Sequence, residues 1–489
     1  ALRVREHCSL LLREVIGTRL LSEQGQVTAV RELVTSFVKQ WPALMPNQVE
    51  PSKLSLVCAV NEISGLLLDL GGAASTVLDV LVDPLITLLS HSSYTVQIAT
   101  AWCLRCLCLS LPVKLTELIT RVLGLVDKDL NHLSNQSAPP DLPKRTLGHT
   151  YGLAALLSVV PARPLDVSFE LSARVFSLAT QLIKTSANKD MVVASIQIQV
   201  SWILVGSLMC LGPNFVKLHL PQLLLLWQTA LPKPNSKDLV TNRTETEWSF
   251  MFHVRECALG AMLSCILHNS KIISPDVAKR LSALLSNTLV FVSSAPSTFS
   301  STNTPNGSTT SVTSHLPSVS LKLSDHEMLL KRRLLQCFVA IRPVSSYENL
   351  STQLLKLSLS YFADPEKYLG SSIIAAIAAV SGSFTSVWTV GDECAFGVTS
   401  RLQGMNIDIA NAARGDQSKS ASRVTTKDWL NRDLVESRLE NQLEQAIIGA
   451  PEYDSLMIYT TYWESSLSCV PKPVPVVSAL VDYSIELFA

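Results

Sequence analysis

The sequence lacks net charge and has few charged residues of either sign. Its 489 residues contain 40 Lys and Arg and 40 Asp and Glu, and charged residues are only 16% of the total. A protein that binds nucleic acid through phosphates, or coats an anionic membrane, usually carries a basic excess. The balance excludes net charge as the means of attracting a partner, and we expect no nucleic-acid binding.

The short motifs of common enzyme classes are also missing. The sequence has no GxGxxG, GxxxxGK[ST], GxSxG, HExxH or EF-hand pattern. Its nine histidines are dispersed, and His149 and His219 lie in apolar stretches without an acidic, Ser or Cys partner in a motif. We interpret both as hydrogen-bonded core or interface residues. We therefore expect no enzymatic activity, no catalytic residue and no cofactor.

A metal-site pattern is incomplete. Cys103 and Cys106 form a CxxC, with Cys108 beside them, but the chain has no second CxxC and no suitably spaced His pair, and a closed zinc site needs four ligands. The eleven cysteines mostly lie in apolar helical patterns, as in cytosolic proteins. We predict three small buried residues in a packed helix and no metal site.

Long hydrophobic runs are absent as well. The best uninterrupted apolar stretches, Ser201 to Leu211 and Ser371 to Val380, fall short of the roughly 20 residues that span a bilayer. We therefore predict a soluble protein without transmembrane insertion. Because the sequence starts at Ala1 and ends on an apolar stretch, we also expect a fragment of a longer chain.

What the sequence does contain is apolar residues at helical spacing. Hydrophobic residues make up 47%, and alternation typical of strands is nearly absent. A chain of this length exceeds one ordinary core, which stops growing near roughly 250 to 300 residues. Short connections carrying Gly, Pro, Ser or Asn join the expected helices, and such connections make neighbouring helices antiparallel. The sequence predicts an all-α fold, an α-solenoid of stacked antiparallel hairpins of the HEAT or armadillo kind.

The expected helices and segments follow from this periodicity and from two polar interruptions. Helices are predicted at 3–21, 27–41, 53–70, 75–90, 94–110, 113–133, 146–159, 168–186, 191–211, 213–230, 250–268, 275–292, 324–341, 346–363, 370–384, 428–448 and 475–488. The expected organisation is a HEAT-repeat solenoid at 1–292, a flexible Ser/Thr-rich loop at 293–323, continued repeats at 324–402, a polar loop at 403–427 and further solenoid helices at 428–489.

An internal repeat supports the solenoid. A branched apolar residue, a polar residue and then small residues and a tryptophan recur along the chain. We assign structural repeat-motif roles to Val96, Ala101, Trp102, Ile196, Trp202, Val254 and Ala258. In a stacked hairpin the branched residue faces its partner helix and the small residues admit the next repeat.

Two further patterns are interpreted as packing features. The basic run from Lys331 to Arg333 is predicted to be the solvated face of an amphipathic helix. The stripe from Leu223 to Trp227 is apolar nearly all round, which predicts a helix buried on both sides.

Three stretches carry a family resemblance. Residues 99–112, 201–213 and 219–227 resemble the HEAT repeat-containing protein 5 family in order and spacing, and residues 478–488 are similar to a later helix of the same proteins. The resemblance implies a non-enzymatic accessory scaffold in clathrin adaptor-dependent vesicle traffic. Its motifs are structural, and no partner-binding residue is carried over.

The resemblance also implies partners and a location. It implies binding to clathrin adaptor complex 1 and aftiphilin-like accessory proteins, with motor-associated proteins for some members, and retrograde and endocytic transport. The implied place is the cytoplasm, peripheral to trans-Golgi network and endosomal vesicles. Self-association into a homo-oligomer stays open. The alternatives are a karyopherin-like transport receptor, which the balanced charge disfavours, and an enzyme, for which the sequence offers no buried ionisable pair.

Overall fold

The described residues of this computed structural model are entirely helical or connecting. They are residues 11–46, 48–133, 138–234, 243–294, 323–341, 347–350 and 353–354, and no strand occurs among them. A π-helical segment at Leu11–Leu20 comes first. The α-helices are α2 Glu23–Ser36, α3 Lys53–Leu70, α4 Leu78–Leu88, α5 Tyr94–Ser110, α6 Leu115–Leu133, α7 Leu142–Leu157, α8 Phe169–Ser186, α9 Met191–Leu208, α10 Pro213–Ala230, α12 Glu245–His268, α13 Pro275–Ser294 and α14 Leu323–Ala340.

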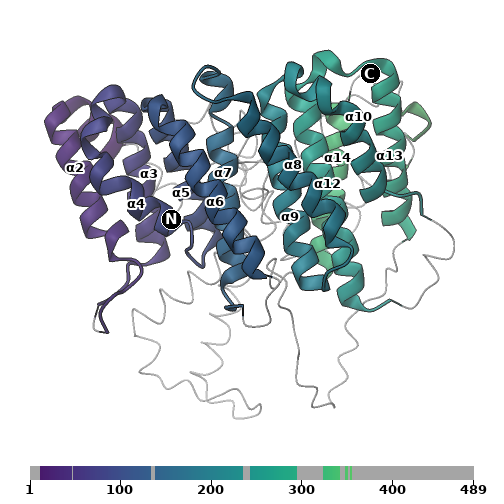
Figure 1. The fold of residues 1–489 in the computed structure, drawn as a ribbon, viewed down its shortest axis with the longest axis horizontal. Coiled ribbons are helices and arrows are strands. Elements are labelled where there is room, and N and C mark those ends of the chain that lie inside the picture. The colour runs from purple at the N-terminus through teal and green to yellow at the C-terminus, as the bar shows by residue number, and fades with distance from the viewer. Residues whose placement is uncertain are drawn as a thin grey trace, which may run out of the picture.

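These helices stack in two layers. Consecutive helices pair as hairpins: α2 with α3, α4 with α5, α6 with α7, α8 with α9, α10 with α12, and α13 with α14. The first helices of the pairs form what we call layer A (α2, α4, α6, α8, α10, α13), and the second helices form layer B (α3, α5, α7, α9, α12, α14), in which each helix contacts the next. Figure 1 shows the pairs side by side in chain order. The described part of the chain is an all-α solenoid, as its periodicity predicts.

Local signals explain where many helices begin and end. The side-chain oxygens of Ser22, Ser52 and Ser168 accept hydrogen bonds from backbone N–H groups in the first turns of α2, α3 and α8. A capping box, in which Thr244 and Glu247 bond each other's backbone N–H, starts α12. Gly71, at φ 52°, ends α3, because a residue with a Cβ rarely adopts this conformation.

Layer B is unusually apolar because its helices are buried. In α9 nearly every side chain from Ala194 to Leu208 is buried. Trp202 of α9 is among the largest fully buried side chains of the described residues. A helix surrounded by protein has no polar face, which is why the sequence of α9 is apolar all round.

The expectation that no apolar stretch reaches membrane-spanning length is wrong. Three helical stretches of the described residues are long and apolar enough to cross a membrane: Ser55–Leu88, Met191–Leu211 and Glu245–His268. The sequence-based estimate counted only uninterrupted apolar runs, whereas residues such as Gln197 and Ser201 lie within α9. In each stretch, part of the most apolar 18-residue segment is buried inside the protein: 78% in Met191–Leu211, 72% in Glu245–His268 and 39% in Ser55–Leu88. Packing within the solenoid accounts for the apolar composition of Met191–Leu211 and Glu245–His268. The absence of membrane insertion stays a prediction.

The stripe from Leu223 to Trp227 is not buried on both sides. Leu223, Leu226 and Trp227 are buried in α10, but Leu225 is exposed. Layer A helices have one neighbour layer only, so their far side faces solvent.

The predicted and observed helices agree in order wherever both are described. Helix α13 extends to Ser294, two residues past the predicted solenoid boundary at 292, since the hydroxyls of Ser293 and Ser294 donate to Leu289 O and Val290 O within the helix. The predicted helices at 370–384, 428–448 and 475–488 lie outside the described residues. So do the polar loop at 403–427 and most of the Ser/Thr-rich segment and of the helix at 346–363.

Candidate functional site

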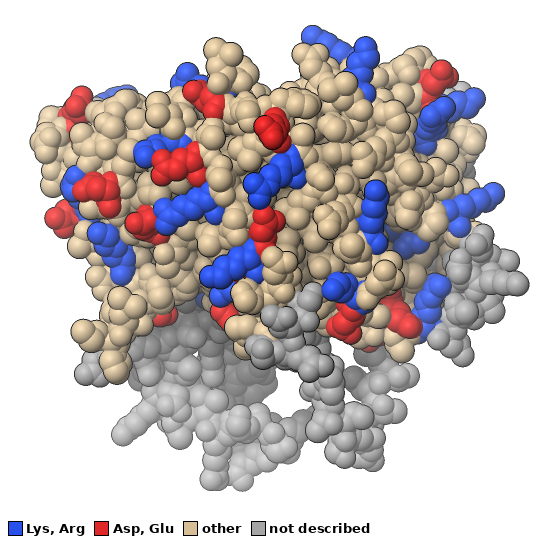
Figure 2. All heavy atoms as spheres, in the orientation of Figure 1, with Lys and Arg blue, Asp and Glu red and all other residues tan. Residues whose placement is uncertain are grey.

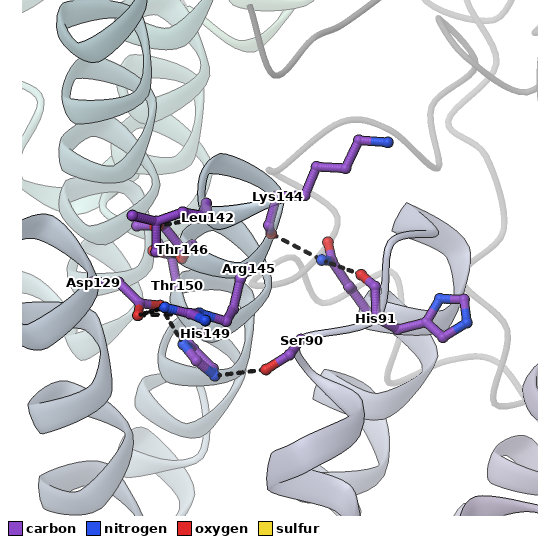
Figure 3. Close-up of polar contacts among 10 residues, drawn as sticks. Ser90, His91, Asp129, Leu142, Lys144, Arg145, Thr146, His149 and Thr150 are labelled. Atoms are coloured by element: carbon purple, nitrogen blue, oxygen red, sulfur yellow. Dashed lines mark hydrogen bonds and ion pairs between the residues drawn. The ribbon is translucent and has the colours of Figure 1, made fainter. Parts of the chain in front are cut away.

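A buried network of polar and ionisable side chains joins two successive hairpins, α4–α5 and α6–α7. Asp129 of α6 contacts two residues of α7: its Oδ2 lies 2.7 Å from His149 Nδ1, and its Oδ1 lies 2.9 Å from Arg145 Nη2. The far nitrogen of the imidazole, His149 Nε2, lies 3.3 Å from the hydroxyl of Ser90, just after α4. Figure 3 shows His149 between Asp129 and Ser90. The side chains of Asp129 and His149 are 3% and 5% exposed.

Hydrogen bonding decides the charge state of Asp129. Burial alone would raise the pKa of this carboxyl, but hydrogen bonds from His149 and Arg145, together with their charges, lower it below the usual value of an aspartate. Asp129 is therefore a carboxylate at neutral pH. A buried carboxylate is stable only when paired in this way.

The order Ser90, His149, Asp129 matches that of a catalytic triad, so its surroundings need to be considered. A serine nucleophile requires N–H groups aimed at the developing oxyanion. The N–H groups of Ser90 and His91 instead donate to Thr87 O and Leu88 O in the last turn of α4. These two amides cannot act as oxyanion donors in this conformation. The contacts of the network fit a structural clamp between hairpins.

Beside this network the backbone of α7 comes very close to the corner between α4 and α5. A Cβ added to Gly148 would lie 1.9 Å from the carbonyl oxygen of Leu89, far inside any allowed contact. At the same corner the side-chain amide of Gln97 donates to His91 O and to Lys144 O (Figure 3), at 2.7 and 2.9 Å. Gln97 follows the motif residue Val96, so at this copy of the motif the polar residue connects one hairpin to the next.

A second buried ion pair connects α12 with α14. Arg333 Nη2 lies 3.0 Å from Glu256 Oε1, and its Nη1 donates to Gln336 Oε1 at 3.1 Å. The Arg333 side chain is 1% exposed, and Lys331 is also buried, beside Glu327. The prediction of a solvated basic face from Lys331 to Arg333 is therefore wrong at these two residues. The sequence gives no sign of the pair because Glu256 lies far away along the chain.

His253 links α9 and α12. Its Nε2 lies within hydrogen-bond distance, 3.3 Å, of the carbonyl oxygen of Ser195. Burial lowers the pKa of His253, opposed by the negative charge of Glu256 and by the bond to Ser195. The neutral imidazole is thus the form that suits the folded state.

His219 differs from the prediction in how it is held. It lies against the rings of Phe176 and Phe215, with centroid distances of 4.2 and 4.7 Å, and its buried Nε2 has no hydrogen-bond partner. Burial lowers the pKa of His219. The prediction of a packed, hydrogen-bonded histidine is confirmed for His149, whereas His219 packs by ring contact.

The cysteines of the CxxC are packing residues, as predicted. Cys103, Cys106 and Cys108 are buried in α5, and burial raises the pKa of Cys108 to about 12. A thiol with so high a pKa stays protonated at neutral pH, so Cys108 is not a nucleophile there. Among the residues that the structure describes, no group of three or more His, Cys, Asp or Glu could hold a metal ion.

The repeat-motif residues occupy corresponding helices. Val96, Ala101 and Trp102 are buried in α5, and Ile196 and Trp202 are buried in α9. In α12, Ala258 is buried, while Val254 is only partly buried. All three helices belong to layer B, two of them separated by α7.

On the opposite layer, a ladder of ion pairs crosses the surface. Successive layer A helices are joined by one Arg–Asp pair each, with N–O distances of 3.3, 2.7 and 3.5 Å: Arg31 to Asp79 (α2 to α4), Arg121 to Asp83 (α6 to α4) and Arg174 to Asp127 (α8 to α6). We call this set the Arg–Asp ladder. It ends at α8.

Comparison with known proteins shows a distant likeness to a yeast protein. Over 433 residues the chain is 22% identical to the AP-1 accessory protein LAA1 of Saccharomyces cerevisiae. The aligned region covers 83% of this chain and 19% of the yeast protein. The chain thus spans about a fifth of the length of that relative. No family model matches the chain, and no solved structure matches it. A likeness at this level supports a distant relationship to LAA1-type proteins.

Proposed function

We propose that this chain is part of a non-enzymatic scaffold that assists the AP-1 clathrin adaptor in vesicle traffic between the trans-Golgi network and endosomes. The observation that carries the proposal is the likeness to a protein named AP-1 accessory protein LAA1 along most of the chain. The fold also supports the proposal, since a stack of helical hairpins offers an extended surface that suits protein binding better than catalysis.

The physical basis of a scaffold is a surface that exists before the partner arrives. Stacked hairpins hold their exposed residues in fixed positions, so a partner docks with little loss of conformational freedom. In this chain the solvated side of layer A is such a surface, because the helices of layer B from α5 to α9 are nearly all buried.

The absence of enzymatic activity is part of the proposal. It is supported by the Ser90 network, in which both nearby amides are already bonded to carbonyls of α4. A Ser90→Ala variant should therefore keep every partner interaction of the parent chain. An esterase signal with generic nitrophenyl esters that disappears in Ser90→Ala would argue for an enzyme instead.

The finer expectations come from the family resemblance. We propose a cytoplasmic protein, peripheral to trans-Golgi and endosomal vesicles, that binds aftiphilin-like accessory proteins and, in some settings, motor-associated proteins. Retrograde transport to the Golgi and endocytic traffic are the processes in which it would act. A homo-oligomer is a further option for the full-length protein.

The test is direct binding to purified adaptor. Immobilised chain is incubated with purified AP-1, and retained adaptor is quantified against a Trp102→Ala/Trp202→Ala double variant, whose loss of two buried tryptophans should unfold the stack. We expect AP-1 to be retained by the parent chain and lost with the variant. Equal recovery on both would mean non-specific adsorption. No recovery on either, also in the full-length protein, would contradict the adaptor function.

A further inference from the structure

The charge pairing of layer A changes along the solenoid. From α2 to α8 the Arg–Asp ladder neutralises its arginines one by one. Beyond it, Lys184 of α8, Lys217 of α10 and Lys279 and Arg280 of α13 are exposed. None of these four has a carboxylate within ion-pair distance among the described residues. Helix α10 contains no Asp or Glu at all.

Figure 2 shows the same change on the molecular surface. Acidic and basic side chains are intermixed over the α2 to α6 side, whereas basic side chains predominate over the side that carries α8, α10 and α13. The acidic residues of these three helices, Glu170 and Asp276, both lie in first turns, of α8 and α13. The exposed face of α8, α10 and α13, which we call the basic face, therefore has a local positive potential although the chain as a whole is neutral.

The basic face also exposes large apolar side chains. Leu218 is 68% exposed and Leu225 is 62% exposed, both on α10. They are seven residues apart, so they lie on one side of the helix, about 10 Å from each other along its axis. Phe169 of α8, 57% exposed, and Val290 of α13, 44% exposed, add apolar surface on the neighbouring helices.

Two contacts place the three helices next to one another. Phe176 of α8 lies 4.2 Å from His219 of α10, measured between ring centroids. On the other side, Asn287 of α13 donates to Leu231 O, just past the end of α10, at 3.2 Å. Helix α10 is thus the middle of the basic face, with its two exposed leucines flanked by basic residues on both sides.

We propose that the basic face is a docking site for an acidic peptide segment that carries two large apolar side chains about two helical turns apart. Its carboxylates pair with Lys217, Lys279 and Arg280, and its apolar side chains cover Leu218 and Leu225. The occupant belongs to a partner protein, so the inference rests on the scaffold function proposed above and names the chemistry of one partner.

The observations favour a peptide over an anionic membrane or a nucleic acid. Membrane-binding basic patches usually cluster four to eight Lys or Arg close together, whereas here four basic residues are spread over three helices. Nucleic-acid sites pair a basic stripe with aromatic stacking groups, and α10 exposes leucines. Helix-in-groove recognition uses apolar anchors at the spacing of Leu218 and Leu225.

The test measures binding of defined probes to the chain. The probe is a fluorescein-labelled peptide of Ala, Asp and Glu with leucines at positions i and i+7, read by fluorescence anisotropy. A matched peptide has Asn and Gln in place of Asp and Glu. We expect the acidic peptide to bind at least about tenfold more tightly than the amide peptide, and its affinity to fall as salt is raised, because the charges are solvent-exposed.

Two variants and one control locate the site. Lys217→Glu/Arg280→Glu and Leu218→Ser/Leu225→Ser should each weaken binding of the acidic peptide by about tenfold or more, whereas Lys128→Glu, an equally exposed layer A position on α6, should leave it unchanged. All of these side chains are exposed, and a thermal melt confirms that each variant is folded. Unchanged affinity in both site variants, or equal binding of the amide peptide, overturns the proposal.

A vesicle arm separates the competing occupant. The parent chain and Lys217→Glu/Arg280→Glu are each sedimented with phosphatidylserine vesicles. If the parent chain binds the vesicles, the variant does not, and the acidic peptide binds neither, the face is a membrane contact and the proposal is overturned. The peptide assay contains no adaptor. A failed docking proposal is thus distinguished from a failed AP-1 interaction, which is measured separately.

Discussion

At the scale of single residues, the close approach of α7 to the α4–α5 corner depends on the missing side chain of Gly148. Gly148→Ala would place a Cβ against the Leu89 carbonyl, and neither backbone can yield without moving α7 or the α4–α5 corner. We expect a loss of roughly 3 kcal/mol or more in the free energy of unfolding. Chemical denaturation of the purified chain measures it.

The control for this prediction is another helical glycine. Gly124 in α6 has nothing within 4 Å of its added Cβ. Gly124→Ala should therefore stabilise the chain by about 0.5–1 kcal/mol, since alanine favours helix more than glycine does. If both variants lost the same stability, the close contact at Leu89 would not be the cause.

A second residue-scale prediction concerns acid. Burial lowers the pKa of His253, so the unfolded chain takes up a proton, near pH 6.5, more readily than the folded one. The contribution of the neutral His253 to the free energy of unfolding is therefore fully present above pH 6.5 and is lost as the pH falls below that value. His253→Gln should make the decline between about pH 6.5 and 5 shallower, measured by denaturant unfolding at each pH, while the lowered pKa of His219 still contributes to it.

Two features keep that measurement specific. His132→Gln removes an exposed histidine of α6 and should leave the profile unchanged. The lowered pKa of Asp129 acts in a separate range, because its contribution is present above the usual aspartate pKa, near 4, and is lost only at lower pH. Parallel profiles of His253→Gln and the parent chain between pH 6.5 and 5 would contradict the assignment.

Residue-level chemistry is also where sequence reasoning reached its limit. Arg333 and Asp129 look like ordinary charged surface residues, and their burial depends on partners elsewhere in the chain: Glu256 for Arg333, and His149 and Arg145 for Asp129. Helical periodicity reports which side of a helix is apolar. It does not report which charged residue on the next helix will neutralise a buried one.

At the scale of helices, the prediction from sequence was accurate where periodicity is strong. The ranges 53–70, 94–110 and 213–230 coincide with α3, α5 and α10. Starts were missed where a cap lies ahead of the apolar pattern: α12 begins at Glu245, five residues before the predicted start, because Thr244 and Glu247 form a capping box. Helix α7 likewise begins at Leu142, since Pro143 is tolerated in a first turn.

The attachment of α14 gives an element-scale prediction. Glu256→Leu removes the carboxylate from Arg333, which stays 1% exposed, and should cost about 3–5 kcal/mol of unfolding free energy. Glu256→Leu/Arg333→Met replaces the pair by apolar side chains and should recover most of the loss. A double variant as unstable as the single one would show that packing volume, and not the buried charge, decides the attachment of α14.

At the scale of the whole molecule, the layered stack follows from short connections and repeated hairpins, and both were visible in the sequence. The surface pattern was not, because each pair of the Arg–Asp ladder joins residues 38 to 48 positions apart in the sequence. Net charge is zero over the chain, and this average conceals the basic face of α8, α10 and α13.

A whole-molecule prediction concerns the segment between α13 and α14. Deleting Ser297 to Ser314 should leave the solenoid intact, because α13 and α14 already contact each other and a shorter connection changes closure entropy by less than about 1 kcal/mol. The far-ultraviolet circular dichroism melt should keep its midpoint. An equally long deletion that removes α8, residues 169–186, should abolish the cooperative melt. The same outcome for the deletion of 297–314 would contradict the prediction.

The Arg–Asp ladder finally has a mechanical consequence. Each exposed pair contributes about 0.2–1 kcal/mol, comparable to the thermal energy of about 0.6 kcal/mol, so the pairs act as weak springs between neighbouring helices. The stack from α2 to α8 is therefore held by these weak links along layer A, whereas among the described residues no Arg–Asp pair joins α8, α10 and α13. Because salt screens exposed charges, the bending compliance of the first half should rise with ionic strength while that of the second half stays constant.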